Sequence, residues 1–243
     1  MTKLYKKSEI TFAILWIAAY VVLSSLADQL SESIGVIKSV TALLHILMSL
    51  ILFFWIRKND LGEKYGFRSS AVPARRFLFY LPLVIIASSA LWGRVKLQYG
   101  FPAALFYVIS MCCVGFLEEL IFRGLLFRAM EKDSLKSAII VSALTFGLGH
   151  IVNLFNGSGR DLYASVFQIV FAVLVGFVLV LIFYNGKSLL PCILFHSANN
   201  ALHVFSAENS LSGQAELILN LALIVALGGY ALYLVKAFPI KEK

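Results

Sequence analysis

The sequence predicts an all-α membrane protein, a polytopic bundle of about eight transmembrane helices with both termini in the cytoplasm. Hydrophobic residues make up 60% of the chain and charged residues only 14%, whereas a soluble domain carries about 25% charged residues. The apolar residues gather in long segments, and the basic residues gather in every second loop between them. The mean hydropathy of +0.87 fits a chain that is mostly embedded in lipid. We expect one membrane domain over residues 1–243.

Eight apolar segments come close to the roughly 17–23 residues that a membrane-spanning helix needs. They cover residues 10–27, 39–56, 77–91, 102–122, 138–155, 162–184, 188–205 and 215–235. The third segment is short, and the fifth contains several polar residues. No internal repeat or Pro-rich linker divides the chain, so these segments are expected to form one bundle.

Lysine and arginine residues orient this bundle. If the N-terminus is cytoplasmic, the cytoplasmic segments contain Lys3, Lys6, Lys7, Arg57, Lys58, Lys64, Arg68, Arg75, Arg76, Arg128, Lys132, Lys136, Lys187, Lys236, Lys241 and Lys243. The opposite side contains only Lys38, Arg94, Lys96 and Arg160. Cytoplasmic loops are enriched in Lys and Arg, so both termini are predicted to be cytoplasmic. Topology then accounts for the net charge of +8, and no pattern of basic and aromatic residues indicates a nucleic-acid partner.

Two adjacent glutamates, Glu118 and Glu119, interrupt the fourth apolar segment. An ionisable residue inside a membrane is costly and usually marks a functional site. Glu119 and Arg123 are four residues apart, so a helix places them face to face as an ion pair. Glu118 is turned by about 100° from Glu119 and faces another direction. A desolvated carboxylate beside a second carboxylate is suited to act as a general base on water.

Two further apolar segments each contain a histidine followed or preceded by a partner at helical spacing. Phe146 and His150 share one helix face, and so do His196 and Asn200. Counting along the helices places these groups and Glu118 at overlapping depths in the cytoplasmic half of the membrane, where they can converge. Among the other histidines, His203 is expected to be an outer neighbour of the site. The small residues Gly147 and Gly149 predict close approach of another backbone near His150, and His45 is expected to serve packing or hydrogen bonding.

Three ordered motifs, Glu118-Glu-Leu-Ile-Phe-Arg123, Phe146-Gly-Leu-Gly-His150 and His196-Ser-Ala-Asn-Asn200, resemble those of a known protease family. This is the CPBP family (CAAX protease and bacteriocin-processing, or Abi) of intramembrane endopeptidases, which includes the Ras-converting CAAX protease. Each motif alone is weak, but the ordered triple on three separate segments is specific. The resemblance covers a catalytic core of about residues 101–205.

The resemblance implies a hydrolase that cleaves a peptide bond. Glu118 would activate water together with His150, His196 and Asn200 would hydrogen-bond the oxyanion, and Glu119 and Arg123 would support the site. Chemistry alone also allows a catalytic zinc held by Glu118, His150 and His196. Asn200 is a poor zinc ligand and the chain contains no His-Glu-x-x-His motif, so a mechanism without metal is favoured and zinc is left open. No other cofactor is expected.

The expected partners are the lipid bilayer and a small membrane-associated peptide or protein, cleaved near the cytoplasmic face. The expected location is a bacterial cell membrane. The resemblance implies maturation of a peptide pheromone or bacteriocin leader or a role in self-immunity, and a prenylated protein substrate is also left open. One alternative is a non-catalytic membrane scaffold or bacteriocin immunity protein. A second is a proton relay in a transporter, although neither inverted repeats nor interrupted helices are evident in the sequence. The complete Glu, His and Asn set favours the enzyme.

Overall fold

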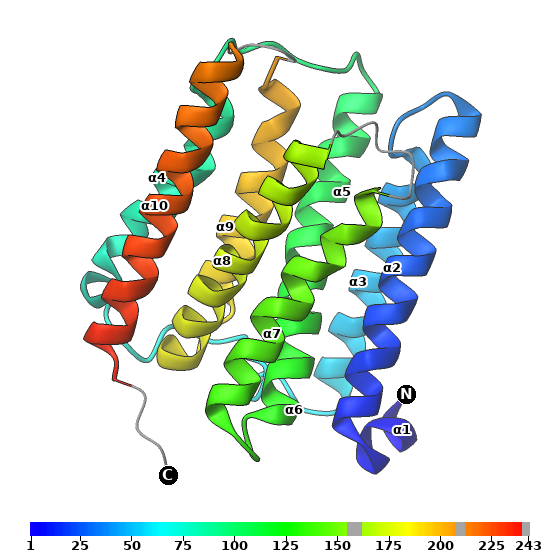
Figure 1. Ribbon diagram of the computed structural model, residues 1–243. Helices are drawn as coiled ribbons and strands as arrows, with labels where there is room; N and C mark the ends of the chain where they lie inside the picture. The colour runs from blue at the N-terminus through cyan, green and yellow to red at the C-terminus, as the bar shows by residue number, and fades with distance from the viewer. Residues whose placement is uncertain (155–161, 208–211, 240–243) are drawn as a thin grey trace.

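The structure is a computed structural model that describes residues 1–154, 162–207 and 212–239. Helices run side by side up and down the molecule, and the described chain begins and ends at the same end of the bundle (Figure 1). We call this end the terminal end and the opposite one the distal end. The predicted all-α fold is confirmed for the described residues. The predicted positions of Phe155, Arg160, Lys241 and Lys243 lie outside them.

The helices follow the predicted segments closely. In chain order they are α1 (Thr2–Lys7), α2 (Glu9–Ile34), α3 (Ser39–Lys58), η1 (Ala74–Tyr80), α4 (Leu81–Ser88), η2 (Ser89–Leu91), α5 (Ala103–Glu118), η3 (Glu119–Phe127), α6 (Arg128–Met130), α7 (Leu135–Gly149), η4 (His150–Leu154), α8 (Leu162–Gly186), α9 (Leu190–Leu202), η5 (His203–Phe205) and α10 (Gly213–Ala237). Serine side chains cap three of them, because Ser8, Ser134 and Ser212 accept hydrogen bonds from backbone N–H groups of the first turn.

Within the described residues, seven helical segments are long and apolar enough to cross a membrane. They correspond to seven of the eight predicted segments. The other prediction, residues 188–205, contains α9, whose 13 residues span about 20 Å against a bilayer core of about 30 Å. The predicted count of eight spans therefore stays a prediction.

The third predicted segment, residues 77–91, is not one continuous helix. Leu78, Phe79 and Tyr80 adopt positive φ angles of 51°, 53° and 59°, and α4 begins only at Leu81. Pro82 lies in the first turn of α4, where its missing N–H costs no helical hydrogen bond. The segment thus enters the bundle through a non-helical turn at the terminal end.

Two glycines allow the close helix packing that positions the site. A Cβ atom at Gly115 of α5 would lie 2.2 Å from Oγ and 2.6 Å from the backbone N of Ser197 in α9. A Cβ atom at Gly147 of α7 would lie 2.7 Å from the backbone N of Val173 in α8. Small residues let helix backbones approach in membrane bundles. The prediction of a close approach holds at Gly147 and is wrong at Gly149, where nothing lies within 4 Å.

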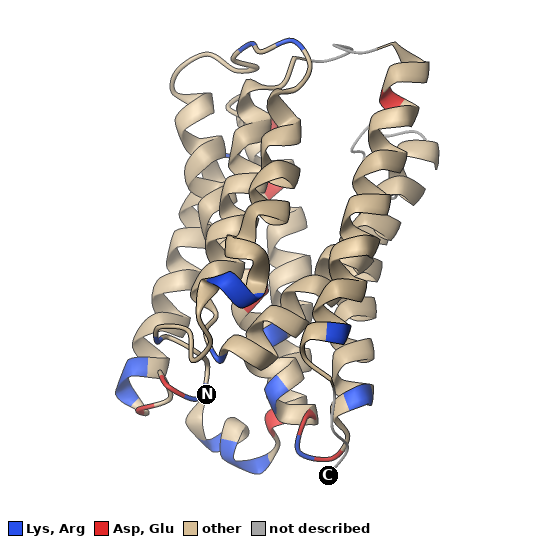
Figure 2. Ribbon diagram, turned by 90° about the vertical axis from the view of Figure 1, so that its left-hand side faces the viewer, with Lys and Arg blue, Asp and Glu red and all other residues tan. Residues whose placement is uncertain are grey.

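Basic residues concentrate at the terminal end, as Figure 2 shows. Among the described residues outside the helix interior, only Lys38, Arg94 and Lys96 belong to the distal loops. Some cations at the terminal end also join separate elements. Lys64 and Lys132 both pair with Glu9, at 2.8 and 3.1 Å. The charge distribution supports cytoplasmic termini, and that orientation stays a prediction.

Candidate active site

The two glutamates lie at a change of helix type. The α-helix α5 ends at Glu118, and the next nine residues, Glu119–Phe127, form the π-helix η3. All nine are buried. Such wide helical turns are rare and often occur at functional sites, because they turn side chains away from the directions of a regular α-helix.

Glu119 is the buried centre of a charged network. Its side chain is 0% exposed, and its Oε1 lies 3.0 Å from Nη1 of Arg123, which is also 0% exposed. The predicted ion pair is therefore present. The same Oε1 accepts a hydrogen bond from Nδ1 of His196 at 2.8 Å. We assign the proton to Nδ1 because an ionised carboxylate can only accept.

Glu118 faces a cavity instead. Its side chain is 13% exposed, and Oε2 lies 3.7 Å from Nε2 of His196. Its Oε1 accepts a hydrogen bond of 2.6 Å from the hydroxyl of Tyr20 in α2. One imidazole thus stands between the two carboxylates, with one ring nitrogen toward each. The buried carboxylate of Glu119 is suited to hold the imidazole ring, and the accessible carboxylate of Glu118 is suited to accept a proton from water.

Phe146 joins the three motifs through its ring. The Arg123 guanidinium carbon lies 4.1 Å from the ring centroid, a cation–π contact that stabilises a buried cation. The rings of His150 and His196 each lie 5.5 Å from the same centroid in edge-to-face arrangement. The predicted shared face of Phe146 and His150 is confirmed. His150 is at the end of α7, and its Nδ1 lies 3.2 Å from the backbone oxygen of Phe146.

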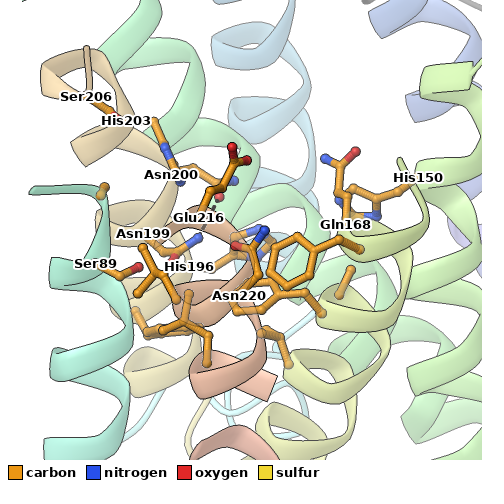
Figure 3. Close-up of a pocket in the computed structure, with 18 of the residues that line it drawn as sticks. Ser89, His150, Gln168, His196, Asn199, Asn200, His203, Ser206, Glu216 and Asn220 are labelled. Carbon is orange, nitrogen blue, oxygen red and sulfur yellow. Dashed lines mark hydrogen bonds between the residues drawn. The ribbon is translucent and has the colours of Figure 1, made fainter. Parts of the chain in front are cut away.

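Two cavities, of about 420 and 290 Å³, meet at this site. His196 lines the larger one and Glu118 the smaller one, whereas His150 and Asn200 line both. The four predicted catalytic residues therefore line two cavities that share part of their walls. Figure 3 shows His150 on one side of the larger cavity and His196 with Asn200 on the other.

The oxyanion role requires hydrogen-bond donors toward this space. Asn200 has an amide NH₂ group, and its Oδ1 already accepts a hydrogen bond of 3.2 Å from Nδ2 of Asn199. His196 donates from Nδ1 to Glu119, so its Nε2 can donate as well only when the ring carries both protons.

The residues that the structure describes do not assemble a zinc site. Zinc needs three or four protein ligands about 2 Å from one point. No group of three His, Cys, Asp or Glu side chains that could hold a metal ion is found in the part of the chain that the structure describes. The set of Glu118, His150 and His196 that the sequence leaves open is therefore not gathered as ligands here.

Several residues around the site are not predicted from the motifs. Tyr20 comes from α2, and Gln168, Asn199, Glu216 and Asn220 line the larger cavity. A tyrosine hydroxyl in the middle of an apolar segment is a usable signal, because it needs a partner inside the membrane.

The predicted outer neighbour His203 lines both cavities. His45 bonds Ser24 and Ser110 at 2.9 and 3.0 Å, which confirms its hydrogen-bonding role.

Comparison with protein-family models finds a match over residues 100–202, described as "Type II CAAX prenyl endopeptidase Rce1-like". The comparisons with curated proteins and with solved structures give no match. The matched segment contains all three motifs and runs from just before α5 to the end of α9. Residues 100–202 of this chain are thus similar to the Rce1-like family of type II CAAX prenyl endopeptidases, and the resemblance that the motifs indicate is confirmed.

Proposed function

We propose that this protein is an intramembrane endopeptidase in which Glu118 activates the attacking water. The family match supports a membrane protease. The observation that carries the mechanism is that the two glutamates lie in different surroundings. Glu118 reaches the cavity, whereas Glu119 is sealed against Arg123 and His196.

In the proposed reaction, a water molecule in the cavity gives a proton to Glu118 and its oxygen attacks the peptide carbonyl. The carbonyl π electrons move to oxygen, and His196 and Asn200 donate hydrogen bonds to the oxyanion. The intermediate then collapses, the C–N bond breaks, and the proton held by Glu118 passes to the leaving amine. His150 lines both cavities, and in this proposal it orients the water or the amine. Donors fixed before the reaction stabilise the developing charge without reorganisation.

The proposed setting is an integral multi-pass protein of a bacterial cell membrane, with a peptide or protein substrate. Several long apolar helices and the protease family support the membrane location. A non-catalytic scaffold or immunity protein is not favoured, because a binding surface has no need for a carboxylate, two imidazoles and an amide around two adjoining cavities. Cells that produce either wild-type protein or Glu118→Gln test the proposal. Mass spectrometry of secreted and membrane peptides should find products only with wild type, and identical peptide profiles would favour the scaffold.

A further inference from the structure

Both cavities at the site are lined from the distal end of the bundle. The larger one reaches Gly93 beyond η2, Ser206 beyond η5 and Glu216 in the first turn of α10. The smaller one reaches Asp28 in the last part of α2, Lys38 before α3 and Val152 in η4. The helix ends and connections to which these residues belong lie at the distal end of the bundle (Figure 1). Deeper in the bundle, His196 lines the larger cavity, and Glu118 and Phe122 line the smaller one.

The terminal end is closed beneath the site. All nine residues of the π-helix that follows Glu118 are buried. The loop after α3 is held at this end of the bundle by hydrogen bonds to the residues that precede α9. In this loop, the carbonyl of Gly66 accepts from the N–H of Leu189 at 2.9 Å, and the carbonyl of Arg68 accepts from Ser188 Oγ at 2.5 Å. Within the described ranges, no residue of 59–80, 131–134 or 187–189 lines either cavity. A substrate therefore has its route to Glu118 from the distal end.

The walls of the larger cavity suit a peptide chain. Gln168, Asn199, Asn200 and Asn220 line it together with phenylalanine rings. An amide side chain can donate and accept at once, which matches the alternating N–H and C=O groups of an extended peptide. Those groups need partners once they leave water. Glu216 adds an exposed acidic group at the rim.

The charge distribution predicts which side of the membrane the distal end faces. The terminal end carries most of the described Lys and Arg residues (Figure 2), so the positive-inside rule places the distal end outside the cytoplasm. We infer that the substrate is a polar peptide segment that enters from the extracytoplasmic side. This inference rests on the proposed peptidase function, and it replaces the expectation of cleavage near the cytoplasmic face.

Cysteine labelling tests the route without any need for activity. Asn220→Cys and Ser206→Cys probe the larger cavity, and Lys58→Cys at the end of α3 is the control at the opposite end. Each substitution is introduced into a full-length chain in which Cys112, Cys113 and Cys192 are replaced by alanine. If that chain purifies poorly, each substitution is introduced into the native chain, and the labelling of the native chain is subtracted. A membrane-impermeant maleimide applied to intact cells should label the two cavity variants and reach Lys58→Cys only after permeabilisation. The reverse pattern would overturn the inference.

Vesicles of known orientation separate this inference from the proposed function. Short unmodified random-sequence peptides are added outside right-side-out and inside-out vesicles that contain wild type or Glu118→Gln, and products are read by mass spectrometry. We expect wild-type-dependent cleavage only in right-side-out vesicles. Cleavage only in inside-out vesicles would overturn the route while supporting the peptidase. If neither vesicle gives products, the peptidase proposal fails and the labelling pattern alone decides the route.

Discussion

The hydroxyl of Tyr20 donates a hydrogen bond of 2.6 Å to Oε1 of Glu118, across 98 positions of sequence. Tyr20 belongs to α2, which lies outside the segment that matches the family. The bond occupies one carboxylate oxygen, so the other is directed toward His196 and the cavity. The first helix that crosses the bundle thus takes part in holding the proposed base.

Removal of this hydroxyl should therefore affect catalysis. A hydrogen bond to a charged group contributes about 1.5–3 kcal/mol, so we expect Tyr20→Phe to lower kcat by roughly tenfold or more with little change in KM. Tyr230→Phe is the matched control, because it also removes one buried hydroxyl bond, 2.9 Å to the backbone oxygen of Phe77. A purely structural role for Tyr20 would lower stability in both variants and leave kcat unchanged in both.

The two glutamates should respond differently to the same change. Glu118→Gln keeps an acceptor for Tyr20 but removes the base, and we expect cleavage to fall by at least about a hundredfold at normal thermal stability. Glu119→Gln removes the charge that Arg123 and His196 contact, so it should lower the melting temperature as well. Thermal unfolding and peptide cleavage are measured on both purified variants. Near wild-type cleavage by Glu118→Gln would show that the assigned base is wrong.

Loss of Arg123 should destabilise the fold. Arg123→Ala leaves Glu119 buried without its cation, which costs about 3–5 kcal/mol in comparable buried pairs. Arg68, which pairs with Glu63 on an exposed surface, is the control, since such pairs contribute about 0–1 kcal/mol. We expect a lower folded yield and melting temperature for Arg123→Ala and little change for Arg68→Ala. Equal melting temperatures for the two variants would remove the structural role of the buried pair.

The amide of Asn200 and the metal question can be tested together. An oxyanion donor contributes about 10²–10³ to kcat, so Asn200→Ala should lower kcat by that order with a smaller effect on KM. Asn220→Ala removes a cavity amide from α10 and should affect KM more than kcat. Elemental analysis of active protein should find no stoichiometric zinc. One zinc per chain, with activity lost to a chelator and restored by zinc, would contradict the glutamate–water mechanism.

Close packing of α5 on α9 should be sensitive to a single methyl group. The added Cβ of Gly115→Ala would overlap the backbone of Ser197, and such overpacking costs about 1–3 kcal/mol. Because His196 precedes Ser197, the shift of α9 should also weaken catalysis. Gly228→Ala in α10 has nothing within 4 Å of the new Cβ and should leave stability unchanged or slightly raised. Full activity and stability of Gly115→Ala would show that the contact does not position the site.

The amino-acid sequence by itself determined the helical membrane fold, its approximate segments and the pairs within two of the three motifs. Glu119 with Arg123 and Phe146 with His150 are neighbours because a helical turn brings residues four apart onto one face. Apolar length predicts membrane helices for a similarly local reason. The order of the three motifs was sufficient to indicate the family that residues 100–202 match.

Only the tertiary structure decided how these pieces meet. The contact of His196 with Glu119 spans 77 positions and that of Tyr20 with Glu118 spans 98, so both depend on which helices pack together. The π-helix after Glu118 and the positive φ angles at residues 78–80 depart from the regular helices that a residue count assumes. Helical periodicity fixes the directions of side chains within one helix. The side from which a cavity is reached depends instead on how the loops and helix ends pack at each end of the bundle. That closure, through buried backbone hydrogen bonds and packed side chains beneath the site, is a property of non-local contacts.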